Sequence, residues 1–500
     1  MAATSTPPDA DPGPSDTHPA PPGSGRGAYD TDTLPAGTDA PLPDADTPPS
    51  GASPVPAGTK PAGPDAGSAP SFPMERVCPY QMPPGYARLR QEGPVSRVSL
   101  YDGRQVWLVG GYAEGRALLL DPRLSSDALH PGFPHLTARQ AQQQRAQRIV
   151  LPLVGADNPQ HARQRRRVAS AFGVRRVAAL RPEIERAAER LIDAMLAAGG
   201  PQEGAPEAHG PQEGAADAAV PEGGTPDDGG QEHRRAELVG DYAMPLTFAT
   251  TFAALGVPPE DRRWFADASR RMLSPPRDDG DGAPEEAFAE IRRYLIDLIT
   301  AREEHPGEGL IDDLIAHRAA DPGLSRDEVA MTCVVLLGGS ESTATTLASA
   351  VLVLLEHPEQ LRELLAEPAL LPTAVDELTR LASVADGLPR VAVADIPVAG
   401  RTIRAGDGVI VSTMLMNRDP AVWADPEAPD VRRAAGRHAA YGHGIHSCIG
   451  QILARAELEI ALATLFRRFP ALRLAVPAGQ VPGHAPYVQQ GGVARLPVTW

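Results

Sequence analysis

A ten-residue stretch near the end of the chain, Tyr-Gly-His-Gly-Ile-His-Ser-Cys-Ile-Gly at 441–450, constrains the fold more than any other. Its three glycines allow left-handed turns and let the backbone lie close to a flat ligand. Apolar residues recur at helical spacing from 449 to 466, so Cys448 is expected in the first turn of a helix. A helix N-terminus lowers the pKa of a thiol, and the thiolate is the form that binds metals. For an isolated cysteine among glycines, however, a buried structural role is the commoner explanation.

Composition narrows the possible classes of protein but does not identify one. The 500 residues are 42% hydrophobic, enough for one large domain or two modest ones. Three scattered cysteines are too few for a disulfide framework, which indicates a reducing, cytoplasmic compartment. No apolar N-terminal segment suggests a signal peptide or a membrane anchor. The apolar run 329–355 is interrupted by a charged glutamate, so we expect a buried helix there instead of a membrane span.

Most of the net charge of −17 belongs to two segments with little to bury. Residues 1–70 are rich in Pro, Ala, Gly and Asp and are expected to form a disordered acidic tail. Residues 199–235 are of low complexity and contain the sequence GPQEGA two times. They are expected to form a flexible loop inserted between two helices. The rest of the chain, within 71–500, is close to neutral and shows no nucleic-acid footprint.

The remaining patterns predict a mainly helical domain with a small β region. Segments 95–100 and 106–109 flank an Asp-Gly turn and predict a hairpin, and short strands are expected within 391–411 and 491–500. Helical periodicity is found at 112–120, 237–255, 261–272 and 284–304.

A long helix is predicted from Ser325 to Pro358, about thirty residues or roughly 45 Å. Ser325 and Glu328 form a capping box at its start. Gly338 and Gly339 weaken its middle by about 2 kcal/mol against alanine. Because polar residues, Glu341 among them, follow the two glycines in an apolar setting, the weak point indicates a functional role. Serine and threonine that bond back to the helix would be the structural alternative.

The 441–450 stretch resembles the haem-binding loop of the cytochrome P450 family, Phe-Gly-x-Gly-x-His/Arg-x-Cys-x-Gly. The pattern is met by Gly442, Gly444, His446, Cys448 and Gly450. Tyr441 replaces the usual phenylalanine and adds a hydroxyl that needs a partner if it is buried. The resemblance implies that Cys448 is the axial thiolate of a haem iron and that His446 meets a haem propionate.

The weak point of the long helix resembles the family's oxygen-activation motif, Ala/Gly-Gly-x-Asp/Glu-Thr. Gly338, Gly339 and Glu341 match it, while Ser342 stands where threonine is usual. Ser342 keeps the hydroxyl that would hold a water and relay protons to bound dioxygen, but it lacks the methyl group that restricts the rotamer. Thr343 lies one residue further round the helix.

A basic segment at 157–172 places His161 and Arg165 on one helical face, where they could bind one anion or simply meet solvent. The resemblance implies that both contact haem propionates, as does Arg390. The neighbouring arginines at 163, 166 and 167 are a candidate patch for an acidic electron donor.

Glu377 and Arg380 form an acid and base pair at i and i+3, which on most helices is a surface pair of little energetic consequence. The resemblance implies instead a buried structural group that Arg433 completes.

Taken together, the resemblance over 71–500 implies one haem domain with the P450 fold, a triangular helical prism with a small β-rich region. It implies a monomeric haem-thiolate monooxygenase containing haem b, which uses O2 and electrons from NAD(P)H through a ferredoxin and its reductase. The expected substrate is a small hydrophobic compound, either a polyketide, macrolide or terpenoid, or a foreign compound. The alternatives are an atypical oxidase that performs epoxidation, oxidative coupling or peroxide-driven turnover, and a haem-binding protein without catalysis.

Overall fold

The computed structural model describes residues 69–138, 140–142, 151–198, 234–273, 283–320, 324–484 and 491–500. All of them belong to one compact unit, Pro64–Trp500. The predictions for the acidic tail and for nearly all of the insert at 199–235 lie outside these residues.

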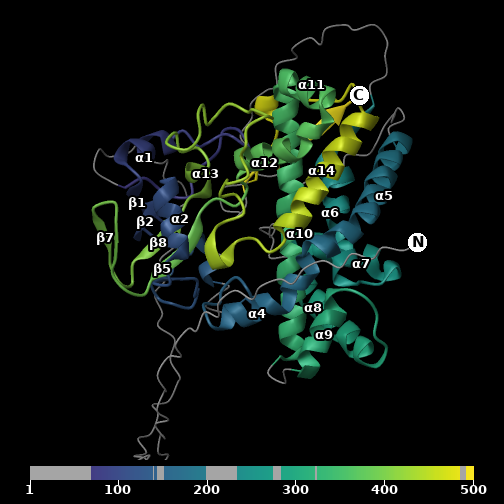
Figure 1. Ribbon diagram of the computed structural model, residues 1–500, viewed down its shortest axis with the longest axis horizontal. Coiled ribbons are helices and arrows are strands. Elements are labelled where there is room, and N and C mark those ends of the chain that lie inside the picture. Colours follow the sequence, from purple (N-terminus) through teal and green to yellow (C-terminus); the bar gives the residue numbers. More distant parts are fainter. Residues whose placement is uncertain are drawn as a thin grey trace, which may run out of the picture. The chain divides into compact units, whose positions relative to one another are not determined.

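Helices dominate this unit, as the sequence predicts (Figure 1). The central one, α10 (Arg326–Glu356), packs against α6 (Met244–Leu255), α8 (Ala283–Glu304), α12 (Leu371–Ala382) and α14 (Gln451–Arg468). The others are α1 (Tyr86–Glu92), α2 (Tyr112–Leu120), α4 (Gln160–Val168), α5 (Val174–Ala198), α7 (Arg262–Leu273), α9 (Leu310–Ala320), α11 (Pro358–Ala366) and α13 (Thr413–Met416). None of the helices that the structure describes is long and apolar enough to cross a bilayer.

The β region is small and lies in three sheets. The largest has the order β1 (Val95–Ser99), β2 (Gln105–Val109), β8 (Gly408–Val411), β5 (Leu388–Ala392) and β3 (Leu124–Ser125). The predicted hairpin is confirmed, because β1 and β2 pair antiparallel around a turn in which Gly103 has φ +80°. The other two sheets join β4 (Arg235–Glu237), β10 (Pro497–Thr499) and β9 (Arg473–Leu474), and β6 (Ile396–Val398) with β7 (Arg401–Ile403).

The start of α10 follows the predicted cap only in part. The Ser325 side chain accepts a hydrogen bond from the backbone N–H of Glu328 at 3.0 Å. The Glu328 carboxylate does not return to Ser325. It binds Arg167 at 3.2 Å, because that guanidinium on α4 offers a charge-assisted partner. Arg167 is therefore paired within the protein, and the basic patch predicted on α4 loses one of its three members.

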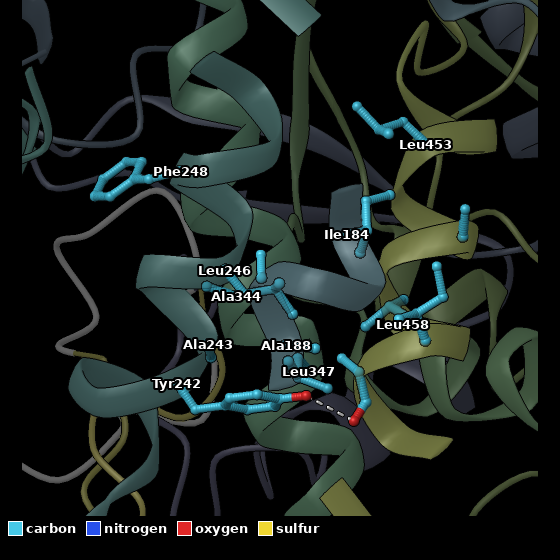
Figure 2. Packing of buried hydrophobic residues seen from close by; sticks show 14 of the residues in the cluster. Ile184, Ala188, Tyr242, Ala243, Leu246, Phe248, Ala344, Leu347, Leu453 and Leu458 are labelled. Carbon is cyan, nitrogen blue, oxygen red and sulfur yellow. Dashed lines mark hydrogen bonds between the residues drawn. The ribbon is translucent and has the colours of Figure 1, made fainter. Parts of the chain in front are cut away.

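The main core lies where α5, α6, α10 and α14 meet (Figure 2). Ile184 from α5, Leu246 from α6, Leu347 from α10 and Leu458 from α14 point into it and are at most 2% exposed. The Tyr242 hydroxyl donates to the backbone carbonyl of Ala461 at 2.9 Å, so the polar group of this buried ring is satisfied. The core fixes α10 and α14 against each other. One of the two most specific sequence motifs lies on α10, and the other directly precedes α14.

Glu457 on α14 is a carboxyl group inside this core, only 4% exposed. One of its oxygens has no hydrogen-bond partner among the described residues. Burial is the main cause that raises the pKa of this carboxyl from 4.5 to about 8, and a hydrogen bond from Thr250 opposes it.

We expect Glu457 to make the protein less stable as the pH rises. Its pKa is higher in the folded state, so between pH 4.5 and about 8 only the folded protein keeps this proton. The free energy of unfolding should therefore fall across that range, by on the order of 4 kcal/mol, and Glu457→Gln should remove this part of the fall. Urea unfolding at pH 5 and pH 8 checks it, with Glu459→Gln, two residues further along α14 and paired with Arg181, as the control. Equal pH dependence in wild type and Glu457→Gln would contradict the prediction.

Candidate functional site

The cysteine loop does not place Cys448 in the first turn of α14, as the sequence pattern predicts. The helix begins at Gln451, and Gly450 is its N-cap. The reason is a contact that periodicity cannot show: the backbone N–H of Cys448 donates to the carbonyl of Tyr441 at 2.8 Å and closes the loop before the helix starts. Gly444 has φ +75°, and a Cβ there would lie 2.3 Å from the Leu119 carbonyl oxygen, so the loop packs against α2 only with glycine at this position.

The Cys448 side chain is exposed, but backbone N–H groups and charged side chains lie near its thiol. The thiol forms no disulfide. Burial among surrounding protein atoms nevertheless raises its pKa, so the net lowering expected from the helix N-terminus is wrong for the thiol by itself. The expected contribution is present, because the backbone N–H groups of Gly450 and Gln451 lower the pKa, as does the charge of Arg165 and Arg455. These groups would all stabilise a thiolate once a metal ion displaced the proton.

His446 and His161 come together beside the loop, with ring centroids 4.2 Å apart. The Nε2 atom of His446 lies 3.0 Å from Ser126 Oγ, and its Nδ1 lies 3.2 Å from the Leu153 carbonyl oxygen. Burial, followed by the charge of Arg390, lowers the pKa of His446 to about 4. Burial also lowers the pKa of His161, which is 2% exposed. Both rings are therefore neutral at pH 7, and the His446 ring is held by two hydrogen-bonding contacts.

Arg165 and Arg390 supply positive charge to the same place. Arg165 donates to Ser447 Oγ at 3.4 Å, and Arg390 donates to the Pro389 carbonyl at 2.8 Å. Burial lowers the pKa of Arg390 to about 10. Asp157 acts on Arg390 electrostatically, but its carboxylate is already bound to the hydroxyl of Ser125 and the backbone N–H of Ser126.

No carboxylate forms a salt bridge with Arg165 or Arg390 among the residues described here. A pair of partly buried guanidinium groups next to two neutral imidazoles is a donor set suited to two external carboxylates. The four residues that the sequence predicts as propionate ligands are thus brought together beside Cys448, and their chemistry fits the carboxylate edge of a haem.

The oxygen-activation motif lies within an unbroken part of α10. A Cβ at Gly338 or Gly339 would meet no atom within 4 Å, and Gly339 is exposed on a helix most of whose residues are buried. The hydroxyls of Ser342 and Thr343 both donate to the Gly339 carbonyl, at 3.1 and 3.2 Å. Open space therefore lies beside Gly338 and Gly339, next to the carbonyl that binds the two hydroxyls.

Glu341 follows in the same turn of α10 and is half-buried. Burial raises the pKa of its carboxyl. Beside it, Ser340 Oγ lies 2.7 Å from Thr251 Oγ1 and links α10 to α6. Sequence reasoning missed Thr251, because nothing along the chain connects it with a helix that begins seventy-five residues later.

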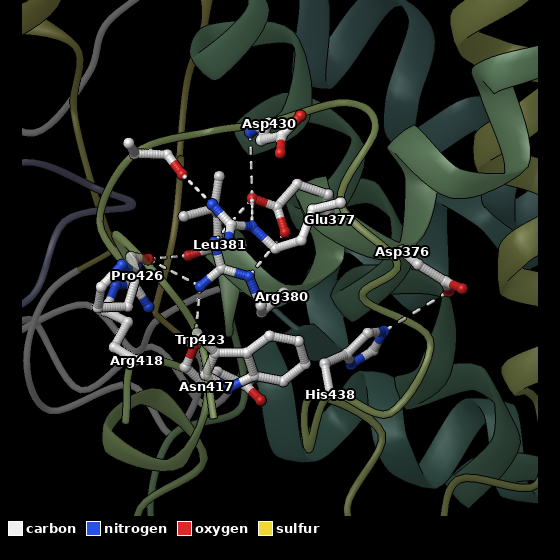
Figure 3. A network of polar contacts seen from close by, with 12 residues as sticks. Asp376, Glu377, Arg380, Leu381, Asn417, Arg418, Trp423, Pro426, Asp430 and His438 are labelled. Carbon is white, nitrogen blue, oxygen red and sulfur yellow. Dashed lines mark hydrogen bonds and ion pairs between the residues drawn. The ribbon is translucent and has the colours of Figure 1, made fainter. Parts of the chain in front are cut away.

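Glu377 and Arg380 form the buried group that the resemblance implies (Figure 3). Both side chains are 0% exposed, and the Arg380 guanidinium donates to both carboxylate oxygens of Glu377 at 2.7 Å. It also donates to the carbonyls of Asn417 and Pro426. Arg433 completes the group by donating to Glu377 Oε1 at 3.0 Å. This network ties α12 to the segment that leads into the cysteine loop.

Comparison with known proteins places these features in a family context. The family model described as Cytochrome P450 matches residues 244–474. Pentalenic acid synthase of Streptomyces avermitilis is 45% identical over 87% of this chain and 98% of its own length. The 20-oxo-5-O-mycaminosyltylactone 23-monooxygenase of Streptomyces fradiae is 39% identical over 86% of this chain and 92% of its own.

Solved structures agree with the sequence relatives. The crystal structure of CYP105D6 superposes with a TM-score of 0.73 at 43% identity and covers 86% of this chain and 98% of its own. The mycinamicin VIII C21 methyl hydroxylase of Micromonospora griseorubida, solved with mycinamicin VIII bound, gives a TM-score of 0.72 at 34% identity and covers 86% of this chain and all of its own.

Proposed function

Because this chain belongs to the cytochrome P450 family and is a haem-thiolate monooxygenase, we propose that it hydroxylates a hydrophobic natural product and that Cys448 is its axial ligand. Haem and O2 are the cofactor and co-substrate of the family. We also propose that residues 71–500 form a single haem domain, with 1–70 as a tail and 199–235 as an inserted loop.

The observation that carries the ligand assignment is the setting of Cys448. The backbone N–H of Cys448 closes a glycine loop, and its exposed thiol lies near backbone N–H groups and the charge of two arginines. In this assignment Cys448 would hold the iron, and His161, Arg165, Arg390 and His446 would hold the propionates. The residues that would also adjoin the haem are Tyr441, Gly442, Gly450, Gly338 and Gly339. When bound, the haem supplies the activation of dioxygen.

Three residues of α10 would deliver protons to the site where dioxygen binds. The hydroxyls of Ser342 and Thr343 both donate to the Gly339 carbonyl. We propose that these two hydroxyls hold a water beside the haem. Burial raises the pKa of the half-buried Glu341 carboxyl, and we assign to this carboxyl the transfer of a proton to that water. The Glu341 carboxyl and the two hydroxyls would together form a short path for protons.

The substrate class is inferred from the relatives. Two of them act, by their names, on the macrolides 20-oxo-5-O-mycaminosyltylactone and mycinamicin VIII, and a third forms pentalenic acid. We therefore propose a polyketide, macrolide or terpenoid of similar hydrophobic character. A screen of such compounds for a shift of the haem Soret band would test this class against unrelated foreign compounds.

Electrons are proposed to come from NAD(P)H through a ferredoxin reductase and a ferredoxin. Arg163 and Arg166 are exposed on α4, the helix that also carries His161 and Arg165. An acidic ferredoxin would be steered to this helix by charge, so replacing both arginines by glutamine should slow reduction most at low ionic strength.

The test of the ligand assignment is the carbon-monoxide difference spectrum of the reduced, haem-loaded protein. A strongly red-shifted Soret band, which thiolate ligation gives, is the expected result. A band at the position typical of histidine or protonated-thiol ligation would contradict the role of Cys448 and, with it, the monooxygenase function proposed for this site.

Replacing Ser342 by alanine is expected to uncouple electron use from product formation. The water that Ser342 would hold loses a partner, so the fraction of NAD(P)H recovered as hydroxylated product should fall at least about tenfold while NAD(P)H consumption continues. Ser342→Thr should raise that fraction, because the added methyl group restricts the rotamer.

Product yield per NAD(P)H, measured with any macrolide that the wild-type protein accepts, checks this prediction. Thr300→Ala is a matched control, because Thr300 also donates to a carbonyl of its own helix, at 2.8 Å, but is exposed on α8. Unchanged coupling in Ser342→Ala would remove Ser342 from the proton path.

A further inference from the structure

A cavity of about 390 Å³ lies where the segment 72–77 meets residues 483–484 and 491–492 near the end of the chain. Its volume falls within the range of about 300–1,000 Å³ that is typical of small-molecule sites. Among the described residues that line it, none is assigned above to the haem or to the proton path. The cavity is therefore a candidate for a ligand that the haem site does not explain.

Arg76 supplies a positive charge to the wall of this cavity and is half-buried. Its Nη1 donates to the Pro79 carbonyl at 3.0 Å, and its Nη2 donates to the Ser383 carbonyl at 3.4 Å. A guanidinium has five N–H groups, so others are left for a further acceptor. Within the part of the chain that the structure describes, Arg76 forms no salt bridge with a carboxylate. Its charge is therefore available to an anion that enters the cavity.

Two carboxylates also line the cavity, and neither serves as the counter-ion of Arg76. The oxygens of Asp386 accept hydrogen bonds from the hydroxyls of Tyr86 and Ser412, at 2.6 and 2.7 Å, and from a backbone N–H of α13 at 3.1 Å. Three donors thus already satisfy the Asp386 carboxylate. The other carboxylate, that of Glu75, belongs to an exposed residue.

His484 is the second donor that the cavity offers, and it is half-buried. Its Nε2 lies 3.5 Å from Thr345 Oγ1, on α10, about one turn after Glu341. Burial, followed by the charge of Arg76, lowers the pKa of His484, so its ring is neutral at pH 7. A neutral imidazole still donates one N–H, which can serve a ligand beside the guanidinium.

The rest of the wall is largely apolar. Phe72, Tyr86 and Leu136 line the cavity and are at most 4% exposed. Val77 lines it as well and is 80% exposed, which places an apolar side chain at its solvent edge. An apolar wall with one cation and few other polar groups suits a ligand that has a hydrocarbon body and one anionic end.

We propose that this cavity binds an apolar carboxylic acid, with the carboxylate held by Arg76 and His484 and the hydrocarbon part packed on the apolar wall. A carboxylate matches the planar fork of a guanidinium and forms strong, charge-assisted hydrogen bonds with it. The inference does not depend on Cys448 as the axial ligand, because Cys448 does not line the cavity.

A purely structural role of Arg76 is the alternative. Ser383 is the C-cap of α12, and a cation beside the last carbonyls of a helix stabilises that helix. Such a role requires no ligand. It predicts that replacing Arg76 lowers the free energy of unfolding and changes the affinity for charged and uncharged ligands alike.

The experiment compares decanoate with 1-decanol, which has the same chain length but no charge, by isothermal titration calorimetry of the haem-loaded protein at pH 7. Wild type should bind decanoate more tightly than decanol. Arg76→Gln should weaken decanoate at least about tenfold and leave decanol within about twofold, because the lost interactions are charge-assisted. Arg76→Lys keeps the charge and should lose less. Urea unfolding of the same variants measures stability separately.

Arg404→Gln is the matched control, since it removes an arginine that is 70% exposed and paired with Asp395, and it should bind decanoate like wild type. Val77→Glu tests the site with Arg76 in place, should Arg76→Gln fail to fold. A carboxylate at this exposed position should repel decanoate and leave decanol unaffected. Absence of decanoate binding in wild type, or equal affinity in wild type and Arg76→Gln, would overturn the proposal.

The Soret band, recorded during the same titrations, separates two sources of the acid. A shift that disappears in Arg76→Gln would identify the acid group as part of a substrate that reaches the haem. Binding through Arg76 without a shift would identify a separate ligand. A shift that Arg76→Gln leaves unchanged would place decanoate in the haem pocket alone and would overturn the assignment of this cavity.

Discussion

Replacing Cys448 by alanine is expected to abolish the red-shifted Soret band of the reduced carbon-monoxide complex and to stop hydroxylation. The sulfur is the group in the loop that can donate electron density to the iron, and alanine leaves no ligand in its place. We expect turnover to fall by at least about 10³-fold, equivalent to about 4 kcal/mol of transition-state stabilisation. The difference spectrum and the rate of product formation measure the two effects separately.

Cys78→Ala is the control for this experiment, because Cys78 is a free, half-buried thiol in the segment before α1. It should retain the band and the activity. Haem that still binds to Cys448→Ala through the propionate contacts would absorb at a different wavelength, which separates loss of the thiolate from loss of the haem. Full retention of the thiolate band in Cys448→Ala would refute the ligand assignment.

Elements defined by contacts close in the chain could be predicted from the sequence. The 95–109 hairpin and the Ser325 cap of α10 are examples, since an Asp-Gly turn or a capping serine acts on residues two to four positions away. The motifs of the haem loop and of α10 were also recognisable, because each is a short run of residues with fixed spacing.

Contacts between distant segments could not be predicted in this way. The Glu328 carboxylate leaves its capping box for Arg167, 161 positions earlier, and no local pattern indicates that choice. The link from Arg455 to Asp376 spans 79 positions and depends on how α12 and α14 pack. The predicted start of α14 is wrong for a related reason: the apolar periodicity begins at 449, but the Cys448 N–H donates to the Tyr441 carbonyl and the helix begins only at Gln451.

The buried network around Glu377 gives the second large expected effect, on stability. In Glu377→Gln the side chain keeps its shape, but Arg380 loses the carboxylate that it binds through two hydrogen bonds and remains 0% exposed (Figure 3). Leaving a buried charge without its partner costs about 3–5 kcal/mol, so the midpoint of urea unfolding should fall accordingly. Haem content should fall with it, because Arg433 connects the same carboxylate to the segment before the cysteine loop.

An exposed pair supplies the comparison. Arg88 and Glu92 lie at i and i+4 on α1, 3.0 Å apart, with side chains 52% and 36% exposed. Glu92→Gln should cost less than about 0.5 kcal/mol, because water already solvates both groups. If Glu377→Gln were as mild as Glu92→Gln, the carbonyls of Asn417 and Pro426 would suffice to stabilise Arg380, and the carboxylate would not be what holds α12 to the approach of the haem loop.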